Sequence, residues 1–434
     1  MKKVLVITYY WPPSGGAGVQ RILKFVKYLP EFEIKPYIVT VREDKASYPV
    51  IDKTLEKDIP SKTEVYRTDT FEPYGIYSGI LGKRSIPTGF SNESNPGAFK
   101  KFSRFVRGNI FIPDARRGWI KYAFNEACRV IENENIDTVI TTSPPHSVQL
   151  TGLKLKKKYK NIYWIADLRD PWTDIYYYDE FKHLPFAKKL DAGFEKDTLI
   201  NADRVVTVSN ELKKLFHSKF SKNESSKIIV IPNGYDDEDF KLSGKEEGRE
   251  FIITYTGTIA DSYNPQIFFH ALKKISDMNA GIKFRLRFIG NPSSSLLEYA
   301  DSISLSGVTE VIPTVTHEES IKYLLSSSAL LLVIPEISND KGILTGKLFE
   351  YLAARKPVIC IGPPNGDAAA IIKECNAGKT FGRNMPSELE NYLNELVSEW
   401  KIKKHLSIDN ENFRKYSRYN QAKELSEIIK GHFN

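Results

Sequence analysis

Near its N-terminus the chain contains the stretch Val4-Leu5-Val6-Ile7-Thr8-Tyr9-Tyr10-Trp11-Pro12-Pro13-Ser14-Gly15-Gly16-Ala17-Gly18, an apolar run that ends in a Pro/Gly-rich turn. The run predicts a buried strand over Val4–Thr8, and apolar residues at helical spacing predict a helix over Val19–Leu29. Glycines in the turn let backbone N–H groups approach an anion, and the N-terminus of the next helix favours negative charge. Gly16 is therefore a candidate phosphate-binding residue. The turn is not a GxGxxG fingerprint, so a plain tight turn remains the alternative.

Short β-rich runs and helix-sized segments alternate along the rest of the N-terminal half. Further strands are expected at residues 36–41, 138–142, 162–166, 205–208 and 228–231. Strands that alternate with helices imply right-handed crossovers and a parallel sheet. The segment 41–95 is rich in Tyr, Ser, Pro and charged residues, and we expect loops and short insertions there.

A second series of the same kind follows a polar connector at Asp236–Arg249. Its strands are expected at residues 251–256, 284–289, 308–312, 329–334 and 357–361, and most of them end in Gly or Pro. The sequence thus predicts an α/β protein with two Rossmann-like parallel-sheet domains, at 1–235 and 236–415, and a C-terminal helix at 416–434. Ligands of such sheets bind outside the carboxyl ends of the strands, so a central cleft faced by both domains is the expected site.

Length and composition limit the class of protein. The 434 residues exceed what one ordinary core holds, and 41% hydrophobic with 27% charged residues is typical of a soluble globular chain. No apolar stretch reaches the ~20 residues that span a bilayer, and the N-terminus lacks a secretory pattern, so a cytoplasmic protein is expected. Cys128, Cys360 and Cys375 have no metal-binding spacing and are expected to be buried, reduced thiols.

The net charge of +8 favours an acidic partner. The sequence contains no zinc-finger, RNA-recognition or basic helix-turn-helix pattern, so nucleic acid is not expected, whereas anionic lipid and phosphorylated small molecules remain. Basic residues concentrate between Phe99 and Tyr122, where they face a single acid, Asp114. They are Lys100, Lys101, Arg104, Arg107, Arg116, Arg117 and Lys121. Apolar spacing predicts an amphipathic helix there, which either contacts an anionic membrane surface or packs on the core with a solvated basic face.

A second glycine-containing turn opens a helix in the C-terminal half, in the stretch Gly342-Ile343-Leu344-Thr345-Gly346-Lys347-Leu348-Phe349-Glu350-Tyr351-Leu352-Ala353. The first-turn N–H groups of such a helix, from Thr345 and Gly346 onward, point at a ligand, and Lys347 adds positive charge. Glu350, one turn further, suits a bidentate hydrogen bond to two neighbouring hydroxyls, as on a ribose. The alternative is structural, with Thr345 as the N-cap and Glu350 as a favourable helix acid.

Four motifs occur in order along the chain. They are Gly15-Gly16, Ile231-Pro232-Asn233-Gly234, Gly257-Thr258 and Lys347-Leu348-Phe349-Glu350-Tyr351-Leu352-Ala353. Together they resemble the retaining GT-B glycosyltransferases of family 4, also called glycosyl transferases group 1. The resemblance implies an N-terminal acceptor domain and a C-terminal domain that binds a UDP- or GDP-linked sugar. It also implies that the C-terminal helix at 416–434 crosses back onto the N-terminal domain. It also implies transfer with retention of anomeric configuration, with no obligatory metal and no cofactor besides the nucleotide-sugar co-substrate. The candidate donor-binding residues are then Gly16, Gly257, Thr258, Thr345, Gly346, Lys347 and Glu350.

Two further segments resemble bacterial members of the family that are of surface-polysaccharide type. They are Ile165-Ala166-Asp167-Leu168-Arg169-Asp170-Pro171-Trp172 and Thr142-Ser143-Pro144-Pro145-His146-Ser147. The resemblance places Arg169 and Asp170 at the reacting sugar as catalytic residues, and His146 at the acceptor, a saccharide that is expected to be lipid-linked. The alternatives are a local Arg–carboxylate network that closes the strand end and a hydrogen-bonded loop histidine.

Three positions depart from the family's pattern. Gly342 stands where the family often has a second donor-site glutamate, Thr258 where it often has an arginine, and Arg169-Asp170 where a histidine is common. Lys347 would then supply the positive charge for the diphosphate. Two other hypotheses therefore stay open: a non-catalytic nucleotide-sugar-binding subunit of a glycosylation complex, and a sugar-nucleotide epimerase on the same architecture.

Overall fold

The computed structural model describes residues 1–72, 98–220, 225–241 and 249–431, and of residues 17, 98–103 and 225 it describes the backbone alone. The chain divides into two compact units. Unit 1 is Met1–Pro232 together with Arg418–Asn434, and unit 2 is Asn233–Ser417. The first boundary falls three residues before the expected position at 235, and the second falls two residues after 415.

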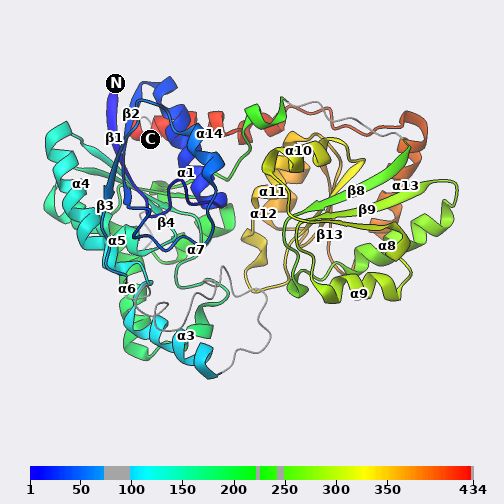
Figure 1. Cartoon of the computed structure of the whole chain (residues 1–434), viewed down its shortest axis with the longest axis horizontal. Coiled ribbons are helices and arrows are strands. Elements are labelled where there is room, and N and C mark those ends of the chain that lie inside the picture. Colours follow the sequence, from blue (N-terminus) through cyan, green and yellow to red (C-terminus); the bar gives the residue numbers. More distant parts are fainter. Residues whose placement is uncertain (73–97, 221–224, 242–248, 432–434) are drawn as a thin grey trace. The chain divides into compact units, whose positions relative to one another are not determined.

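The described part of unit 1 contains a seven-stranded parallel sheet in the order β3-β2-β1-β4-β5-β6-β7 (Figure 1). Its strands are β1 (Lys2–Ile7), β2 (Ile34–Val41), β3 (Glu64–Thr68), β4 (Thr138–Ser143), β5 (Tyr163–Leu168), β6 (Arg204–Thr207) and β7 (Ile228–Val230). The direction of winding reverses between β1 and β4, where Leu5 pairs with Val139. This reversal is the topological switch point of the sheet, at which open parallel sheets bind their ligands.

The helices of unit 1 cover both faces of this sheet. They are α1 (Ala17–Tyr28), α3 (Ala98–Ile110), α4 (Ile120–Glu134), α5 (Ser147–Lys158), α6 (Pro185–Asn201), α7 (Asn210–Ser218) and α14 (Arg418–Lys430), with short 3-10 turns η1 (Leu29–Phe32), η2 (Lys53–Asp58), η3 (Arg117–Trp119), η4 (Tyr178–Phe181) and η5 (Ser225–Lys227). Because side chains alternate along a strand, Val4 and Val6 pack with α1 and α14, while Leu5 and Ile7 pack with α4 and α5.

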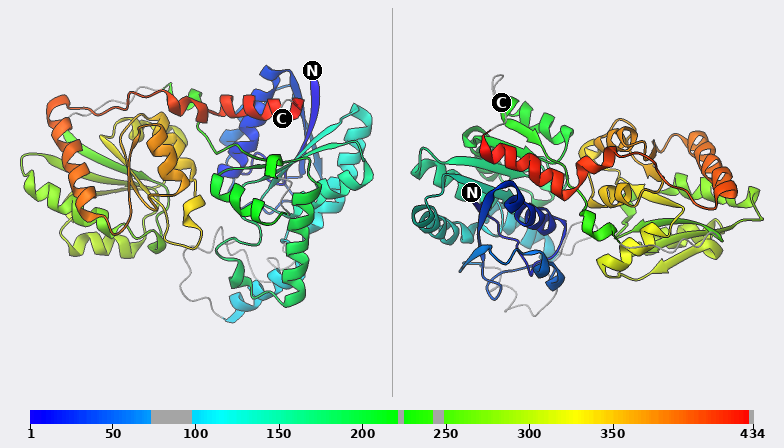
Figure 2. Two further views of the ribbon diagram at one scale, coloured as in Figure 1. Left: turned by 180° about the vertical axis from the view of Figure 1, so that it is seen from behind. Right: turned by 90° about the horizontal axis from the view of Figure 1, so that it is seen from above.

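The last helix belongs to unit 1. Figure 2 shows α14, in red, lying alongside α1, in blue, in both views. Leu425 and Ile428 of α14 are buried in the same core cluster as α1, and the rings of Tyr28 and Tyr419 meet edge to face at 5.7 Å. Burial of one such aliphatic side chain contributes ~1.5–3 kcal/mol, so this helix stabilises unit 1 although it lies at the far end of the sequence.

The described part of unit 2 has a six-stranded parallel sheet in the order β10-β9-β8-β11-β12-β13. Its strands are β8 (Glu250–Thr256), β9 (Lys283–Ile289), β10 (Thr309–Ile312), β11 (Ala329–Val333), β12 (Val358–Ile361) and β13 (Gly378–Phe381). Its helices are α8 (Gln266–Met278), α9 (Ser294–Ser302), α10 (His317–Leu325), α11 (Gly346–Ala353), α12 (Asp367–Glu374) and α13 (Pro386–Lys403), with 3-10 turns η6 (Asp237–Phe240), η7 (Asp261–Tyr263), η8 (Ser306–Val308), η9 (Asp340–Gly342) and η10 (Asn412–Tyr416). Helices α8, α9 and α13 cover one face, and α10, α11 and α12 cover the other. The switch point lies between β8 and β11.

The predicted fold class, with two Rossmann-like parallel-sheet domains, is confirmed. The three cysteines are buried free thiols, as predicted. The expectation of loops and short insertions at 41–95 did not include the edge strand β3 at Glu64–Thr68. Residues 73–95 of that segment lie outside the described residues. An edge strand pairs on one side only, so a short run with charged residues suffices, and its apolar pattern is weak.

The predicted amphipathic helix near residue 100 exists as α3, but the basic segment 99–122 is not one continuous surface. Arg116 is buried, where it pairs with Glu72 at 3.3 Å, and Trp119 is a core residue whose indole N–H donates to Thr68 Oγ1. The side chains of Lys100 and Lys101 lie outside the described part. The segment therefore divides into a helix, a loop region that holds the buried Arg116 and Trp119, and the start of α4, where Lys121 and Tyr122 are exposed.

Candidate functional site

Lys347 occupies the switch point of unit 2. Its ammonium donates to the hydroxyl of Tyr255 at 2.6 Å and lies 4.2 Å from the centre of that ring, and the carbonyl of Thr258 is 3.5 Å away. Within the described chain, no carboxylate lies within ion-pair distance of this ammonium. Burial lowers the pKa of Lys347 to about 8, and the charge of Glu350 acts in the opposite direction. A partly buried cation without a carboxylate partner is suited to bind an anion.

Gly257 makes the close approach of Lys347 possible. It ends β8 with φ of 91°, and a Cβ there would lie 2.8 Å from Lys347 Cε. Gly290, at the end of β9, packs equally closely, because its Cβ would lie 2.8 Å from the Gly257 carbonyl oxygen. On the other side, Tyr351 of α11 accepts the backbone N–H of Thr256 at 3.0 Å, which fixes α11 against the end of β8.

The start of α11 offers further donors next to Lys347. Thr345 is at the N-cap position, but its hydroxyl does not cap the helix; it is buried without a hydrogen-bond partner among the described residues. Gly346 is the first helical residue, and nothing lies within 4 Å of where its Cβ would be. The structural alternative for Thr345, side-chain capping, is therefore not observed. Open space, a helix N-terminus and an ammonium combine into an anion-binding geometry.

Glu350 lies one turn further along α11, on the same face as Lys347. Its Oε1 is 3.9 Å from His317 Nδ1, and His317 Nε2 is 3.2 Å from Asp239 Oδ2. The sequence did not single out His317 or Asp239, because they are 33 and 111 positions away from Glu350 and belong to no motif. The pair orients a carboxylate that remains partly exposed.

Another residue that sequence reasoning missed is Arg383, which follows β13. Its guanidinium donates to the carbonyls of Tyr263 and Ile334 at 2.9 and 3.0 Å, so it joins the turn after β8 to the end of β11. Glu336 lies 3.2 Å from its Nε. The only signal in the sequence was a basic residue directly after a short strand.

Gly16, the remaining predicted donor-binding residue, belongs to unit 1. It is the N-cap of α1 with φ of 103°, and nothing lies within 4 Å of where its Cβ would be. The positive φ favours glycine there, and its N–H lies at a helix start beside open space.

Arg169 holds together three segments at the switch point of unit 1. Its Nε and Nη2 donate to the carbonyls of Ser143 and Pro144 at 2.9 and 3.0 Å, and a Cβ on Gly18 of α1 would lie 2.0 Å from its Nη1. Burial lowers the pKa of Arg169, and the charges of Asp167 and Asp170 act in the opposite direction. Asp170 follows it, and burial raises the pKa of its carboxyl against the opposite effect of Arg169.

Asp167 is structural. Its Oδ1 accepts from the fully buried Arg21 of α1 at 3.0 Å, and its Oδ2 accepts from Thr142 at 2.7 Å. The alternative of an Arg–carboxylate network is therefore correct for Asp167, although the arginine is Arg21 and not the neighbouring Arg169. Asp170 has no part in this network.

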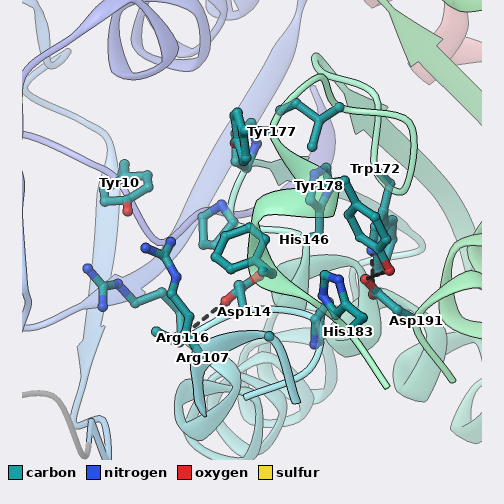
Figure 3. Close-up of a pocket in the computed structure, with 17 residues that line it drawn as sticks. Tyr10, Arg107, Asp114, Arg116, His146, Trp172, Tyr177, Tyr178, His183 and Asp191 are labelled. Carbon is teal, nitrogen blue, oxygen red and sulfur yellow. Dashed lines mark hydrogen bonds between the residues drawn. The ribbon is translucent and has the colours of Figure 1, made fainter. Parts of the chain in front are cut away.

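His146 follows the Pro-Pro turn after β4 and lines a cavity of about 160 Å³ within unit 1 (Figure 3). Its ring stacks on that of Trp172, with centroids 4.7 Å apart. Burial lowers the pKa of His146 to about 3, with the charge of Arg169 acting in the same direction, so the imidazole is neutral. Its Nδ1 is buried without a hydrogen-bond partner among the described residues. The alternative, a loop histidine held by hydrogen bonds, is therefore not observed at Nδ1 of His146.

The cavity is built from segments that are far apart in the sequence. Aromatic side chains dominate its wall: Tyr10, Trp172, Tyr177, Tyr178 and Phe181. Asp191 of α6 accepts from Trp172 Nε1 at 2.7 Å and from Tyr178 Oη at 2.9 Å, and burial raises its pKa to about 6. Arg107, Asp114, Arg116 and His183 complete the polar lining. Aromatic faces with a few polar groups form a surface suited to a sugar ring.

No helix in the described chain has both the length and the apolar character needed to cross a membrane. Within the same residues, no cluster of three or more His, Cys, Asp or Glu side chains could hold a metal ion.

Comparisons with known proteins agree with this fold. The family model described as Glycosyltransferase Family 4 matches residues 88–239, and the model described as Glycosyl transferases group 1 matches residues 236–418. A D-inositol 3-phosphate glycosyltransferase from Rhodococcus erythropolis is 21% identical over 180 residues, which are 38% of this chain and only 39% of that protein.

Solved structures with the same fold cover the whole chain. A lipopolysaccharide outer core galactosyltransferase in its apo form has a TM-score of 0.58 at 12% identity, with all of both chains covered. A sucrose-phosphate synthase from Thermosynechococcus elongatus has a TM-score of 0.57 at 13% identity and covers all of this chain and 95% of its own. These likenesses show the fold, and the two adjoining family models, which together span residues 88–418, show that the chain belongs to the family 4 glycosyltransferases of GT-B type.

Proposed function

We propose that this chain is a retaining glycosyltransferase, which moves a sugar from a UDP- or GDP-linked donor to a saccharide acceptor. The observation that carries the proposal is the partly buried ammonium of Lys347 at the switch point of unit 2, next to a helix N-terminus and without a carboxylate partner in the described chain. A nucleoside diphosphate supplies the negative charge that this environment lacks.

In this proposal each donor-binding residue has a separate role. Lys347 and the N–H groups that follow Thr345 bind the diphosphate, and Gly257 keeps the ammonium close to the strand end. Glu350, oriented by His317, accepts hydrogen bonds from the ribose hydroxyls. Thr258 contributes its backbone, because its carbonyl accepts from Tyr255 and lies near Lys347.

The residues stabilise the charges that develop as the sugar–phosphate bond breaks. Negative charge grows on the leaving diphosphate, where Lys347 and the helix N–H groups are already oriented. Positive charge grows at the anomeric carbon, where the Asp170 carboxylate offsets it. Arg169, held by two carbonyls, fixes the position of Asp170. No step requires a metal ion, and activity in the presence of a chelator tests this part.

The acceptor binds in the aromatic cavity of unit 1. Its rings suit the apolar face of a sugar, and His146 offers a neutral imidazole as a hydrogen-bonding group. We include in the proposal that the acceptor saccharide is lipid-linked, which makes the protein a peripheral one on the inner face of the cell membrane in envelope polysaccharide synthesis.

The test is a screen of UDP-, GDP- and ADP-sugars with release of nucleoside diphosphate as the readout. Release that is accelerated by acceptor saccharides supports transfer, and proton NMR of the product reports whether the anomeric configuration is retained. Conversion of the donor sugar without release would identify an epimerase. Nucleotide binding without any turnover would identify a binding subunit.

Matched variants locate the site in the same assay. Lys347→Ala and Glu350→Ala should each weaken nucleotide binding by about 10- to 150-fold, because each removes a charge-assisted interaction of about 1.5–3 kcal/mol. Lys341→Ala, an exposed lysine of η9, is the control and should leave the affinity unchanged. Unchanged affinity in the two site variants would remove this site from the proposal.

A further inference from the structure

Two pairs of stacked rings form part of the wall of the unit 1 cavity. The imidazole of His146 lies on the indole of Trp172, with centroids 4.7 Å apart and an interplanar angle of 13°. The imidazole of His183 lies on the ring of Tyr178, with centroids 4.2 Å apart and an angle of 18°. We call these pairs the Trp172 stack and the Tyr178 stack. All four residues line the cavity, so the position of each stack helps to set its shape.

Asp191 of α6 connects the two stacks (Figure 3). Its Oδ1 accepts from Trp172 Nε1 at 2.7 Å, and its Oδ2 accepts from the Tyr178 hydroxyl at 2.9 Å. Each oxygen of the carboxylate therefore serves one stack. Asp191 is only 2% exposed, and burial raises its pKa to about 6, so the carboxyl is ionised and accepts both hydrogen bonds above pH 7.

The position of the Trp172 ring depends on this carboxylate. Trp172 is 2% exposed, so bulk water cannot take the place of Asp191 as the acceptor of its N–H. A buried donor without an acceptor is costly, and its side chain shifts toward any group that can accept. His146 stacks on the face of the same indole, so a change at Asp191 should also displace the imidazole of His146.

The cavity has the size of one six-membered ring. Its volume is about 160 Å³, and an apolar protein cavity of about 150 Å³ admits a benzene ring. Gly108 of α3 contributes to this space, because a Cβ there would lie 2.6 Å from Phe181 Cβ and 3.2 Å from His183 Nε2. Aromatic walls suit the apolar face of a sugar. The ligand that matches both size and lining is a single pyranose residue.

We propose that Asp191 is a positioning residue of the acceptor site. It fixes the Trp172 stack and the Tyr178 stack, and the two stacks set the width of a cavity that binds one sugar residue at the end of the acceptor. Both of its oxygens accept hydrogen bonds from the stacks, so Asp191 acts through them. This role rests on the proposed function, because it assumes that unit 1 binds the acceptor.

Steady-state kinetics of the full chain with single-residue acceptors test this role. The probes are the methyl glycosides of glucose, galactose, mannose and N-acetylglucosamine, and the one with the lowest KM is used for the variants. Asp191→Ala should raise the acceptor KM by about tenfold or more, which corresponds to about 1.4 kcal/mol or more, because both stacks lose their acceptor. The KM for the donor should stay the same, since the Lys347 site is unchanged.

Asp191→Asn is the conservative variant. Its amide can accept from Trp172 and donate to the Tyr178 hydroxyl, so it should restore most of the acceptor affinity that Asp191→Ala loses. The matched control is Asp197→Ala, which changes an exposed acid of the same helix and should leave both KM values as they are. Circular dichroism and nucleotide affinity should be equal for all three variants, which shows that each is folded.

A spectroscopic signature tests the contact without any acceptor. In the ¹⁵N-labelled chain, the indole N–H resonance of Trp172 should shift as the pH falls through about 6, because Asp191 then gains a proton. Asp191→Asn should abolish this shift. The nearby titratable groups Asp114, His183 and Glu195 remain in that variant, so a shift that persists would come from one of them and would contradict the role of Asp191.

The kinetic outcomes separate this proposal from the proposed function. Acceptor-stimulated turnover with an unchanged acceptor KM in folded Asp191→Ala overturns the role of Asp191 alone. Turnover that longer saccharides stimulate but no methyl glycoside does overturns the single-residue cavity. Turnover that no saccharide stimulates contradicts the proposed function, and the Trp172 resonance then still decides whether Asp191 fixes the stack.

Discussion

The environment of one residue, Lys347, indicates a site for an anionic ligand. A lysine whose ammonium is removed from water without a carboxylate partner loses solvation free energy, and its lowered pKa reflects that loss. An anionic ligand restores the charge balance at such a residue when it binds. The contact with the Tyr255 ring and hydroxyl stabilises the cation in part and sets its position.

The pKa of Lys347 predicts a pH dependence of nucleotide binding. The ammonium is charged below about pH 8 and neutral above it, so the affinity for a nucleoside diphosphate should fall as the pH rises from 7 to 9. The decrease is at most tenfold per pH unit, because one proton is involved. Isothermal titration calorimetry in buffers of different ionisation enthalpy measures both the affinity and the proton uptake.

Lys347→Arg is the control for this measurement, since a guanidinium stays charged throughout the range. Its affinity should be independent of pH between 7 and 9, even if its absolute value is lower. The same pH dependence in this variant as in the natural chain would assign the proton to another group.

Gly257→Ala should weaken nucleotide binding without removing any side chain that binds. The substitution introduces a Cβ 2.8 Å from Lys347 Cε at a φ of 91°, so the ammonium must move and the backbone is strained by about 1–2 kcal/mol. Thermal unfolding and calorimetry should show lower stability and lower affinity together. Gly281→Ala is the matched control, because no atom lies within 4 Å of its Cβ.

At the scale of elements, α14 illustrates a contact that joins the two ends of the chain. Leu425→Ala with Ile428→Ala should destabilise unit 1 by about 2–5 kcal/mol for each substitution, since both side chains are fully or almost fully buried against α1. Hydrogen exchange should speed up in β1 and α1 and stay unchanged in β8 and α11. Lys423→Ala, an exposed residue of the same helix, should change neither.

At the scale of the whole molecule, the chain has two units with separate cores, and each has a candidate site at the switch point of its own sheet. A saturating nucleoside diphosphate should slow hydrogen exchange in unit 2, at the end of β8 and the start of α11. A ligand at 100 times its dissociation constant adds about 2.7 kcal/mol to the stability of what it binds. If hydrogen exchange slows only in unit 1, the donor binds there, and the assignment of the donor site to unit 2 is wrong.

Local patterns determined much of this protein. The alternation of strands and helices predicted both parallel sheets, because hydrophobic periodicity is a property of neighbouring residues. The stretch from Thr345 to Glu350 was identified for the same reason: a turn, a helix start, a lysine and a glutamate lie within six residues. The edge strand β3 was missed, because a half-paired strand needs little apolar sequence.

Tertiary structure alone decided which distant residues meet. The cavity combines Tyr10, His146 and Asp191, and no spacing in the sequence relates them. The buried partner of Asp167 is Arg21, 146 positions away, and not Arg169 two positions along, which binds carbonyls. Which distant residues pair depends on how the sheet is wound and how α1 packs on it. The sequence therefore shows which residues could form an ion pair, but not which two of them do.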